Sequence, residues 1–277
     1  MEVIIVDDSA QVADQAAAIV CQMVRHKPDS VLGLATGSTP IDMYRRLVAL
    51  HQSGHLSFAQ VVSFNLDEYI GVAPDAPQSY RSFMKRVLFD AVDIPAAQTF
   101  LPECAPGQDP RAVGPVYEAL IAKHGGIDLQ VLGIGGNGHI GFNEPTSSLA
   151  SRTRVKTLTR HTLRDNHSGF DAQARQPSMA ITMGIATIMA ARRVLLLATG
   201  ERKAAAIRAA IEGPIAALHP ASVLQAHPRV RMVVDEAAAS QLSLRDYYHR
   251  VHTQAEWIAG KYDGSRVGDP WFHPASG

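Results

Sequence analysis

The sequence has little cysteine, no excess of either charge and no long apolar run. Its 277 residues include only Cys21 and Cys104, which excludes a disulfide framework and leaves two reduced thiols. Lys plus Arg and Asp plus Glu balance at 26 each, so there is no basic surplus to attract nucleic acid or hold a membrane surface. We expect neither nucleic acid nor membrane as a partner, and an anionic ligand must be bound by a local site.

Membrane insertion and secretion are also not expected. No segment reaches the roughly 18 consecutive apolar residues of a membrane-spanning helix. The N-terminal stretch MEVIIVDD has an apolar run of only 4 residues with acids behind it, so we interpret it as a first strand and not as a signal peptide. These absences predict a cytoplasmic protein, and 46% hydrophobic residues predict a large core.

Short runs rich in Val, Ile and Leu alternate with Ala-rich helical segments. The expected strands are 2–6, 31–35, 61–66, 128–134, 194–198 and 232–235, and the expected helices are 10–25, 40–51, 79–89, 183–190 and 202–210. This alternation implies right-handed crossovers and a mostly parallel sheet with helices on both faces. The pattern predicts a doubly wound, Rossmann-like α/β fold with three layers.

Two polar stretches interrupt this rhythm. The first, within residues 145–177, carries several Arg and His, and we interpret the segment of about 146–180 as a lid. The second is the tail 247–277, which we interpret as a frayed terminus without an assigned role. No linker rich in Pro, Gly and Ser divides the chain, so we predict one domain over residues 1–246.

Ligands of an open parallel sheet bind outside the carboxyl ends of its strands. The second expected strand is followed by "TGSTP", in which a glycine permits close approach and hydroxyls and free helix N–H groups supply donors. This predicts a phosphate site at Thr36, Gly37, Ser38 and Thr39, with Pro40 opening the next helix. A hydroxyl-rich helix cap without a ligand is the alternative.

Lys203 follows a later strand, in "TGERKAAAI", within the first turn of an expected helix. A cation there opposes the helix dipole unless an anion lies nearby, so Lys203 is either a second phosphate contact or a solvated lysine. The spacings of a nucleotide P-loop and of a dinucleotide fold are both missing, which favours a small phosphorylated metabolite as ligand. Metal-ligand spacings and a serine-nucleophile elbow are missing too, so we expect no metal and no cofactor.

Acid–base side chains follow the third and fourth strands. Asp67 and Glu68 come directly after an apolar run, where carboxylates are costly to desolvate, so at least one is expected to move a proton. Solvated loop acids are the alternative. In "VLGIGGNGHIGFNEP", glycines let the chain turn and present Asn137, His139 and Glu144. Histidine is the side chain in this loop whose unperturbed pKa lies near neutrality, and Glu144 is placed to orient His139, although a lone histidine is usually structural.

A phosphate anchor with two acid–base stations predicts isomerisation of a phosphorylated sugar. The segments "LGLATGSTP", "FNLDEY", "LGIGGNGHIGFNEP", "TMGIATIMAARRVLLLATGERKA" and "PASVLQAHP" resemble, in order and spacing, the glucosamine-6-phosphate deaminase (isomerising) family over roughly residues 2–245. The resemblance implies conversion of glucosamine 6-phosphate and water to fructose 6-phosphate and ammonia, as a hydrolase of the amino-sugar C–N bond. It implies no metal and no organic cofactor.

The resemblance also assigns roles to residues. Asp67 is similar to the base that moves a proton between C2 and C1, and His139 to the ring-opening residue, with Glu144 as its charged partner. Thr36, Gly37, Ser38, Thr39 and Lys203 match the phosphate-binding positions. The run "SLASRTRVKTLT" resembles the segment where some members bind the activator N-acetylglucosamine 6-phosphate between subunits of a homohexamer, which implicates Ser147, Arg154, Lys156 and Thr157. A solvated charged face is the alternative there.

The chain departs from the family pattern at three places. Some members have Asp at the position of Asn137, and an amide holds an imidazole without stabilising its charge, so we expect a less basic His139. In the lid the run is Asn166-His167-Ser168, where the family usually carries an Arg two residues after the Asn. Arg164, His167 or no residue replaces that phosphate contact. The tail beyond residue 246 matches nothing in the family.

Two other functions remain open from the sequence. A 6-phosphogluconolactonase-like hydrolase shares the fold, but that family reads Gly-His-Thr-Ala-Ser-Leu-Phe-Pro where this chain has "GHIGFNEP". A sugar-phosphate-binding regulatory domain would carry a DNA-binding helix-turn-helix, whereas here the sheet is expected to begin at residue 2.

Overall fold

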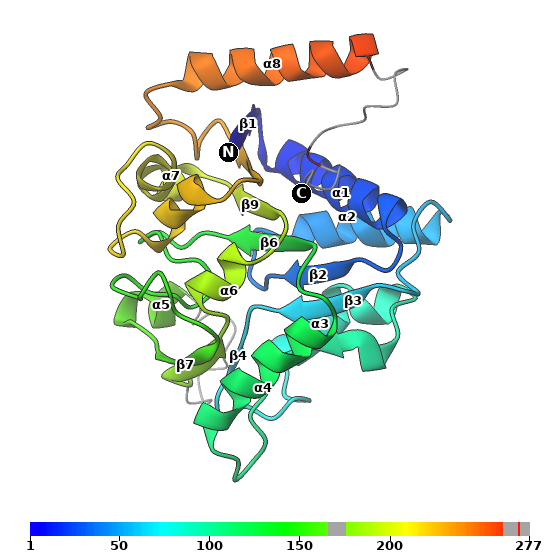
Figure 1. Cartoon of the computed structure of the whole chain (residues 1–277), viewed down its shortest axis with the longest axis vertical. Coiled ribbons are helices and arrows are strands. Elements are labelled where there is room, and N and C mark those ends of the chain that lie inside the picture. Colours follow the sequence, from blue (N-terminus) through cyan, green and yellow to red (C-terminus); the bar gives the residue numbers. More distant parts are fainter. Residues whose placement is uncertain (166–175, 263–270, 272–277) are drawn as a thin grey trace.

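The computed structural model describes residues 1–165, 176–262 and 271. Its centre is a seven-stranded parallel sheet with the order β1-β10-β9-β6-β2-β3-β5 (Figure 1). The strands are β1 (Glu2–Val6), β2 (Val31–Leu34), β3 (Val62–Asn65), β5 (Thr99–Phe100), β6 (Leu129–Gly133), β9 (Val194–Ala198) and β10 (Val230–Asp235). Most of their residues are buried, which is why they read as near-continuous apolar runs. The expected doubly wound α/β fold is confirmed.

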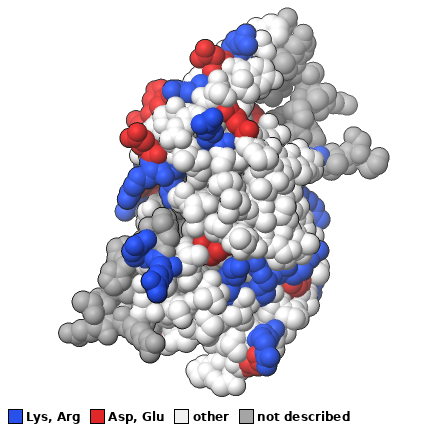
Figure 2. Space-filling model, turned by 90° about the vertical axis from the view of Figure 1, so that its left-hand side faces the viewer, with Lys and Arg blue, Asp and Glu red and all other residues white. Residues whose placement is uncertain are grey.

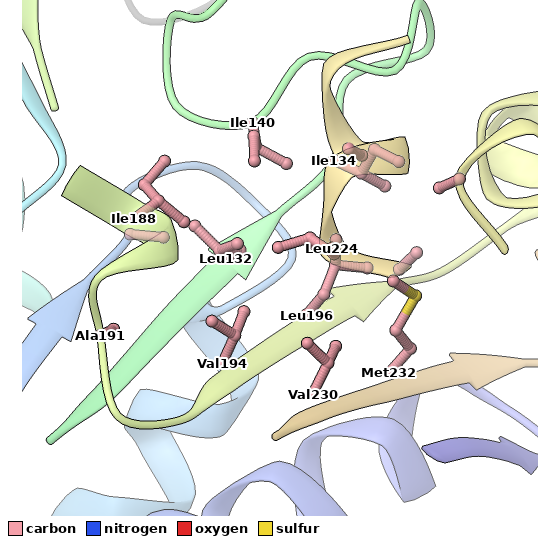
Figure 3. Close-up of a cluster of buried hydrophobic side chains, with 14 of the residues drawn as sticks. Leu132, Ile134, Ile140, Ile188, Ala191, Val194, Leu196, Leu224, Val230 and Met232 are labelled. Carbon is pink, nitrogen blue, oxygen red and sulfur yellow. The ribbon is translucent and has the colours of Figure 1, made fainter. Parts of the chain in front are cut away.

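Helices cover both faces of this sheet. One core cluster joins strand residues such as Leu32 and Val131 to α1 (Ser9–His26), α2 (Ile41–Gln52) and α3 (Tyr80–Val87). The cluster on the other face joins alternate strand residues such as Leu132 and Leu196 to Ile188 of α6 and to Leu224, as Figure 3 shows. The helices of that face are α4 (Pro110–Lys123), α6 (Ile185–Met189) and α7 (Ala204–Ile211). Short 3₁₀ turns, η1 (Phe89–Ala91), η2 (Ala96–Gln98), η4 (Glu201–Lys203) and η5 (Pro220–Ala226), complete the connections.

A second, smaller sheet was not expected. It is antiparallel, with the order β4-β8-β7, and consists of β4 (Asp67–Tyr69), β8 (Met179–Thr182) and β7 (Arg154–Thr157). The polar segment 145–177 therefore contains β7 and α5 (Arg160–Asp165), while residues 166–175 lie outside the described residues. Asp67 does not end the third strand but begins a new one, in which it pairs with Thr182 of β8.

The interpretation of the tail as a frayed terminus is wrong for its described residues. They form α8 (Arg245–Tyr262), whose start is fixed by Glu212, which accepts hydrogen bonds from the N–H groups of Ser243 and Leu244 at 2.8 and 2.9 Å. Trp271 is buried, and the guanidinium groups of Arg231 and Arg193 lie 4.6 and 5.8 Å from its ring. Among the described helices, none combines the length and apolar character that crossing a bilayer requires.

Candidate active site

The four chemically distinctive segments follow four strands that are neighbours in the sheet. In spatial order these strands are β9, β6, β2 and β3, and they are parallel, so their carboxyl ends share one edge. At about 4.8 Å per strand spacing, this edge spans about 14 Å, a suitable length for one hexose phosphate. The chain leaves β2 toward β3 and β5 on one side and continues from β6 toward β9 and β10 on the other, so the switch point lies between β2 and β6.

The loop after β2 is built to leave its donors available. Gly37 has a φ of 101°, a left-handed conformation that glycine adopts without strain. Helix α2 begins at Ile41 with Pro40 as its N-cap, and no side chain caps this helix. The hydroxyls of Ser38 and Thr39 are therefore not used to cap α2, which weighs against the cap-only alternative.

Lys203 lies at the junction of η4 and α7, where it is partly exposed. The turn that precedes it is held by Gly200, which has a φ of 85° and donates its N–H to both carboxylate oxygens of Asp235 at 2.9 and 3.0 Å. Lys203 thus follows the carboxyl end of β9, two strands away from the loop after β2. The structure places both expected phosphate contacts at the same edge of the sheet.

The loop after β6 arranges three side chains into one network. The side-chain N–H of Asn137 donates to Oε2 of Glu144 at 3.0 Å, so its Oδ1 must face His139, and Nδ1 of His139 lies 2.6 Å from that oxygen. Because an amide oxygen only accepts hydrogen bonds, Nδ1 carries the proton and the lone pair of the imidazole lies on Nε2. The network fixes the tautomer that a general base needs.

Glu144 is the charged member of this network. It is 2% exposed, and its Oε1 accepts hydrogen bonds from the N–H and the hydroxyl of Thr159 at 3.1 and 3.0 Å. Burial alone would raise the pKa of Glu144, but hydrogen bonds from Thr162, Thr159 and Asn137 and the nearby His139 outweigh burial and hold the pKa below its usual value. The carboxylate, 3.7 Å from Nδ1 of His139, supplies a negative charge that Asn137 lacks.

Two glycines make room for this arrangement. A Cβ atom on Gly135 would lie 2.1 Å from Cε1 of His139, so the imidazole lies against the backbone where any other residue would displace it. Gly141 has a φ of 52°, and a Cβ atom there would lie 3.4 Å from Oδ2 of Asp67. The N–H of Phe142, the next residue of this loop, is a hydrogen-bond partner of the Asp67 carboxyl, so the histidine loop adjoins the aspartate that follows β3.

Asp67 is a buried carboxyl with a strongly altered basicity. It is 5% exposed, and burial together with the charge of Glu68 raises the pKa of Asp67 to about 8, although the N–H of Phe142 and the hydroxyl of Thr182 favour its ionised form. A carboxyl that titrates near neutrality can both take up and release a proton during turnover. Asp67 therefore has the properties of a general base.

Two further side chains, which were not expected from the sequence, hold these groups. Thr182 of β8 accepts a hydrogen bond from the N–H of Phe142 at 3.1 Å and lies beside Asp67. Asn143 donates to the carbonyl groups of Ile140 and Met183 at 2.9 and 2.8 Å and so ties the histidine loop to β8. Asn143 stands within the glycine-rich stretch, whereas nothing in the sequence around Thr182 signalled its position.

The residues expected to bind an activator are only partly brought together. Arg154 and Lys156 lie on the same face of β7, and both are partly buried; burial lowers the pKa of each. Thr157 is exposed on the opposite face, and Ser147 is 2% exposed. The side of the molecule that carries α5, α7 and β7 faces the viewer in Figure 2, where Lys and Arg gather in a band across the middle.

Other expected and observed features lie away from the strand ends. Asn166, His167 and Ser168 lie outside the described residues, and the side chain of Arg164 is exposed on α5.

A groove of about 930 Å³ lies between α1 and α2, on helices that cover the sheet, so we assign the chemistry to the strand ends and not to this groove. No group of three or more His, Cys, Asp or Glu is arranged to hold a metal ion within the described part of the chain.

A doubly wound sheet with a glycine- and hydroxyl-rich loop and acid–base side chains at its switch point defines an α/β enzyme of the proton-transfer class. Residues 7–233 match the family described as glucosamine-6-phosphate isomerases/6-phosphogluconolactonase, and the chain belongs to this family.

Similar proteins agree with this assignment. The chain is 52% identical over 271 residues to a glucosamine-6-phosphate deaminase of Shewanella loihica, across 97% of this chain and 100% of that protein. It is 54% identical over 262 residues to that of Hahella chejuensis, across 95% and 100%. A solved structure described as a monomeric glucosamine-6-phosphate deaminase is 42% identical, with a TM-score of 0.84 over 87% of this chain and 100% of that one. The 6-phosphogluconolactonase of Trypanosoma cruzi is 20% identical, with a TM-score of 0.68 over 87% and 97%, a likeness of fold alone.

Proposed function

We propose that this protein is a glucosamine-6-phosphate deaminase that converts glucosamine 6-phosphate and water to fructose 6-phosphate and ammonia. The observation that carries the proposal is the contact between a buried base, Asp67, and a loop that presents His139 through Asn137 and Glu144. The names of the relatives that are more than half identical to this chain support the same substrate. Because water replaces the amino group, we class the net reaction as hydrolysis of a C–N bond.

Ring opening is the task of the His139 network. Nε2 of His139 carries the lone pair, so it takes the proton of the anomeric hydroxyl and returns it to the ring oxygen as the C1–O5 bond breaks. The imidazolium that forms in between is stabilised by the carboxylate of Glu144, 3.7 Å from Nδ1. The less basic His139 that Asn137 implies stays a prediction.

Asp67 performs the second task on the open-chain aldehyde. It takes the proton from C2, which the neighbouring C1 carbonyl makes acidic. The electron pair of the C–H bond forms the C1=C2 double bond of an enolamine, and the π pair of the C1 carbonyl passes to O1. Asp67 then returns the proton to C1 as the nitrogen lone pair forms the C2=N bond, and a proton passes from the nitrogen to O1, which leaves a hydroxyl at C1 and an imine at C2. Water adds to that imine and ammonia departs, giving the C2 ketone of fructose 6-phosphate. A raised proton affinity suits Asp67 to both transfers.

The phosphate group anchors the substrate. We assign it to the N–H groups and hydroxyls of Thr36, Gly37, Ser38 and Thr39 and to the ammonium group of Lys203, which follow β2 and β9 at the same edge of the sheet. We further propose that residues 1–246 form the catalytic domain and that the segment of about 146–180 acts as its lid. In support, β7 of this segment pairs with β8, and β8 pairs with β4, which starts with Asp67.

Regulation and assembly are finer proposals. Arg154 and Lys156, adjacent on β7, offer two cations to the phosphate of N-acetylglucosamine 6-phosphate, and Arg154 donates to Oδ1 of Asn143 at 2.9 Å, a contact with the histidine loop. Ser147 and Thr157 remain assigned to this site by resemblance.

A homohexamer is supported by the exposed apolar side chains of Leu244, Tyr247 and Trp257 in and before α8, although one relative is described as monomeric. Light scattering with and without activator tests both proposals. The cytoplasmic location stays a prediction.

A coupled assay tests the function. Ammonia release from glucosamine 6-phosphate is expected, with fructose 6-phosphate formed in equal amount. Hydrolysis of 6-phosphogluconolactone without ammonia release would instead support the lactonase alternative. Ligand binding without turnover of either compound would support the regulatory alternative.

A further inference from the structure

The second carboxyl of β4, that of Glu68, has no task in the reaction described above. Glu68 is 3% exposed, as deeply buried as its neighbour Asp67, which is 5% exposed. Successive residues of a strand point to opposite faces, so Glu68 points away from the side on which Asp67 meets the histidine loop. A buried carboxyl with no role is costly, so its surroundings need an explanation.

The surroundings of Glu68 are peptide N–H groups. Its Oε1 accepts hydrogen bonds from the N–H groups of Tyr69 and Tyr80 at 2.8 and 3.0 Å, and its Oε2 accepts one from Arg81 at 3.0 Å. Tyr80 and Arg81 are the first two residues of α3, and the next free N–H of that helix, on Ser82, donates to the hydroxyl of Ser79 at 3.0 Å. Glu68 thus caps the positive end of the helix dipole.

Two opposing effects act on the carboxyl of Glu68. Burial raises the pKa of Glu68 above its usual value, while the N–H groups of Tyr80, Tyr69 and Arg81 lower it and favour the ionised form. The guanidinium of Arg81 pairs with Glu103, at 2.5 and 2.8 Å, and in the described ranges no Lys or Arg forms an ion pair with Glu68, although the charges of Arg81 and Glu68 attract each other. Peptide N–H groups are the direct hydrogen-bond partners of this carboxyl.

Glu68 and Asp67 are consecutive residues of β4 and both are buried, although their side chains point to opposite faces of the strand. The other groups around Asp67 are Tyr80 of α3 and Tyr117 of α4, and burial raises the pKa of both phenols well above the usual value, so they stay neutral. The remaining neighbours are Thr182 of β8 and the histidine loop, whose titratable groups His139 and Glu144 pair through Asn137. Glu68 is therefore the adjacent fixed charge that acts on Asp67.

We propose that Glu68 is a positioning residue for the proposed deaminase reaction: the N-terminus of α3 holds its carboxylate, buried and charged, next to Asp67 in β4, and this charge assists the transfer of a proton from carbon to Asp67. Glu68 touches no substrate and acts only through Asp67. The inference rests on the proposed function, because it assigns Asp67 the proton transfer at C2.

The test is the pH profile of kcat/KM for ammonia release, measured from about pH 6 to about pH 10. Glu68→Gln removes the charge and keeps the size of the side chain, so the acidic midpoint of the profile is expected to move down by about 1 pH unit or more. Glu68→Asp keeps the charge but withdraws it from α3, so its midpoint is expected to stay at the wild-type value while KM rises. Asp90→Asn, which removes an exposed acid just beyond α3, is the matched control and should leave the profile unchanged.

The outcomes separate this inference from the proposed function. A wild-type enzyme that releases no ammonia overturns the function itself. An active wild type whose midpoint is unchanged in Glu68→Gln overturns the role of Glu68 alone. If circular dichroism shows that Glu68→Gln does not fold, Glu68→Asp decides, because a midpoint that drops despite the retained charge contradicts the proposal.

Discussion

Replacing Asp67 with asparagine should stop turnover and at the same time change how stability depends on pH. The folded state raises the pKa of Asp67 from 3.8 to about 8, so between these values the folded protein binds a proton that the unfolded chain releases. Stability from this group is fully present below the unfolded pKa and is lost as pH rises through the folded pKa. Asp67→Asn removes this proton and therefore this loss.

The magnitude follows from the proton count. Between pH 6 and pH 8, one proton lost at about 1.4 kcal/mol per pH unit gives about 3 kcal/mol, and half-ionisation of the folded state at pH 8 reduces this to about 2 kcal/mol. The wild type should lose about 2 kcal/mol more unfolding free energy than Asp67→Asn over this interval. Comparing each protein with itself at two pH values cancels any constant effect of the substitution, and subtracting the change in the variant from the change in the wild type cancels the other titrating groups.

Urea unfolding followed by circular dichroism at the two pH values measures this difference. The matched control is Asp90→Asn, an exposed acid that should behave as the wild type does. Equal pH dependence in the wild type and in Asp67→Asn would refute the reasoning, because it would mean that Asp67 does not titrate between pH 6 and pH 8. The same experiment with phosphate present should show that Asp67→Asn still binds the anion.

Three further substitutions test other parts of the structure. Lys203→Ala removes one charged contact to the phosphate, so KM should rise about ten- to hundredfold with kcat nearly unchanged; a pure loss of kcat in steady-state assays contradicts the assignment. Gly135→Ala places a Cβ atom 2.1 Å from the ring of His139, so the ring must move and kcat should fall about a hundredfold or more. The thermal unfolding temperature should change little. A fully active variant would argue against the observed position of the ring. Trp271→Ala should lower the free energy of unfolding in urea by about 3 kcal/mol, because Arg193 and Arg231 hold the ring. The value of kcat should be preserved, since the ring lies at the amino-terminal edge of the sheet, opposite the candidate site. Unchanged stability would refute the docking of Trp271.

The sequence predicted six of the seven strands of the central sheet because parallel strands buried on both faces leave a strong local signal, and it missed only the two-residue edge strand β5 (Thr99–Phe100). Each expected strand lies within two residues of an observed one, from β1 to β10. The helix α4 was missed because Pro115 and the adjacent Gly114 read as a break, although Asp109 caps it and Pro110 opens it. Gly114 is there for packing, since a Cβ atom on it would lie 2.2 Å from the carbonyl oxygen of Thr153.

The small antiparallel sheet was missed for a different reason. Its strands are short, three or four residues each, and β7 reads as a charged run because it alternates Arg154 and Lys156 with other residues. The pairing of β4 with β8 joins segments more than 100 residues apart, such as Asp67 with Thr182, which no local pattern encodes. The candidate site was nevertheless predictable as a set, because each motif follows a strand whose position in the sheet could be anticipated.

The two acids of β4 show where such prediction ends. In the sequence Asp67 and Glu68 are adjacent and chemically alike, and the analysis could conclude only that one of them should move a proton. The start of a new strand at Asp67 sends the two side chains to opposite faces, one against the histidine loop and the other against the N-terminus of α3. Burial, followed by the charge of Glu68, raises the pKa of Asp67 to about 8, whereas three N–H groups oppose the effect of burial on the pKa of Glu68. The division of roles comes from tertiary contacts, which place one carboxyl at the histidine loop and the other at the N-terminus of α3.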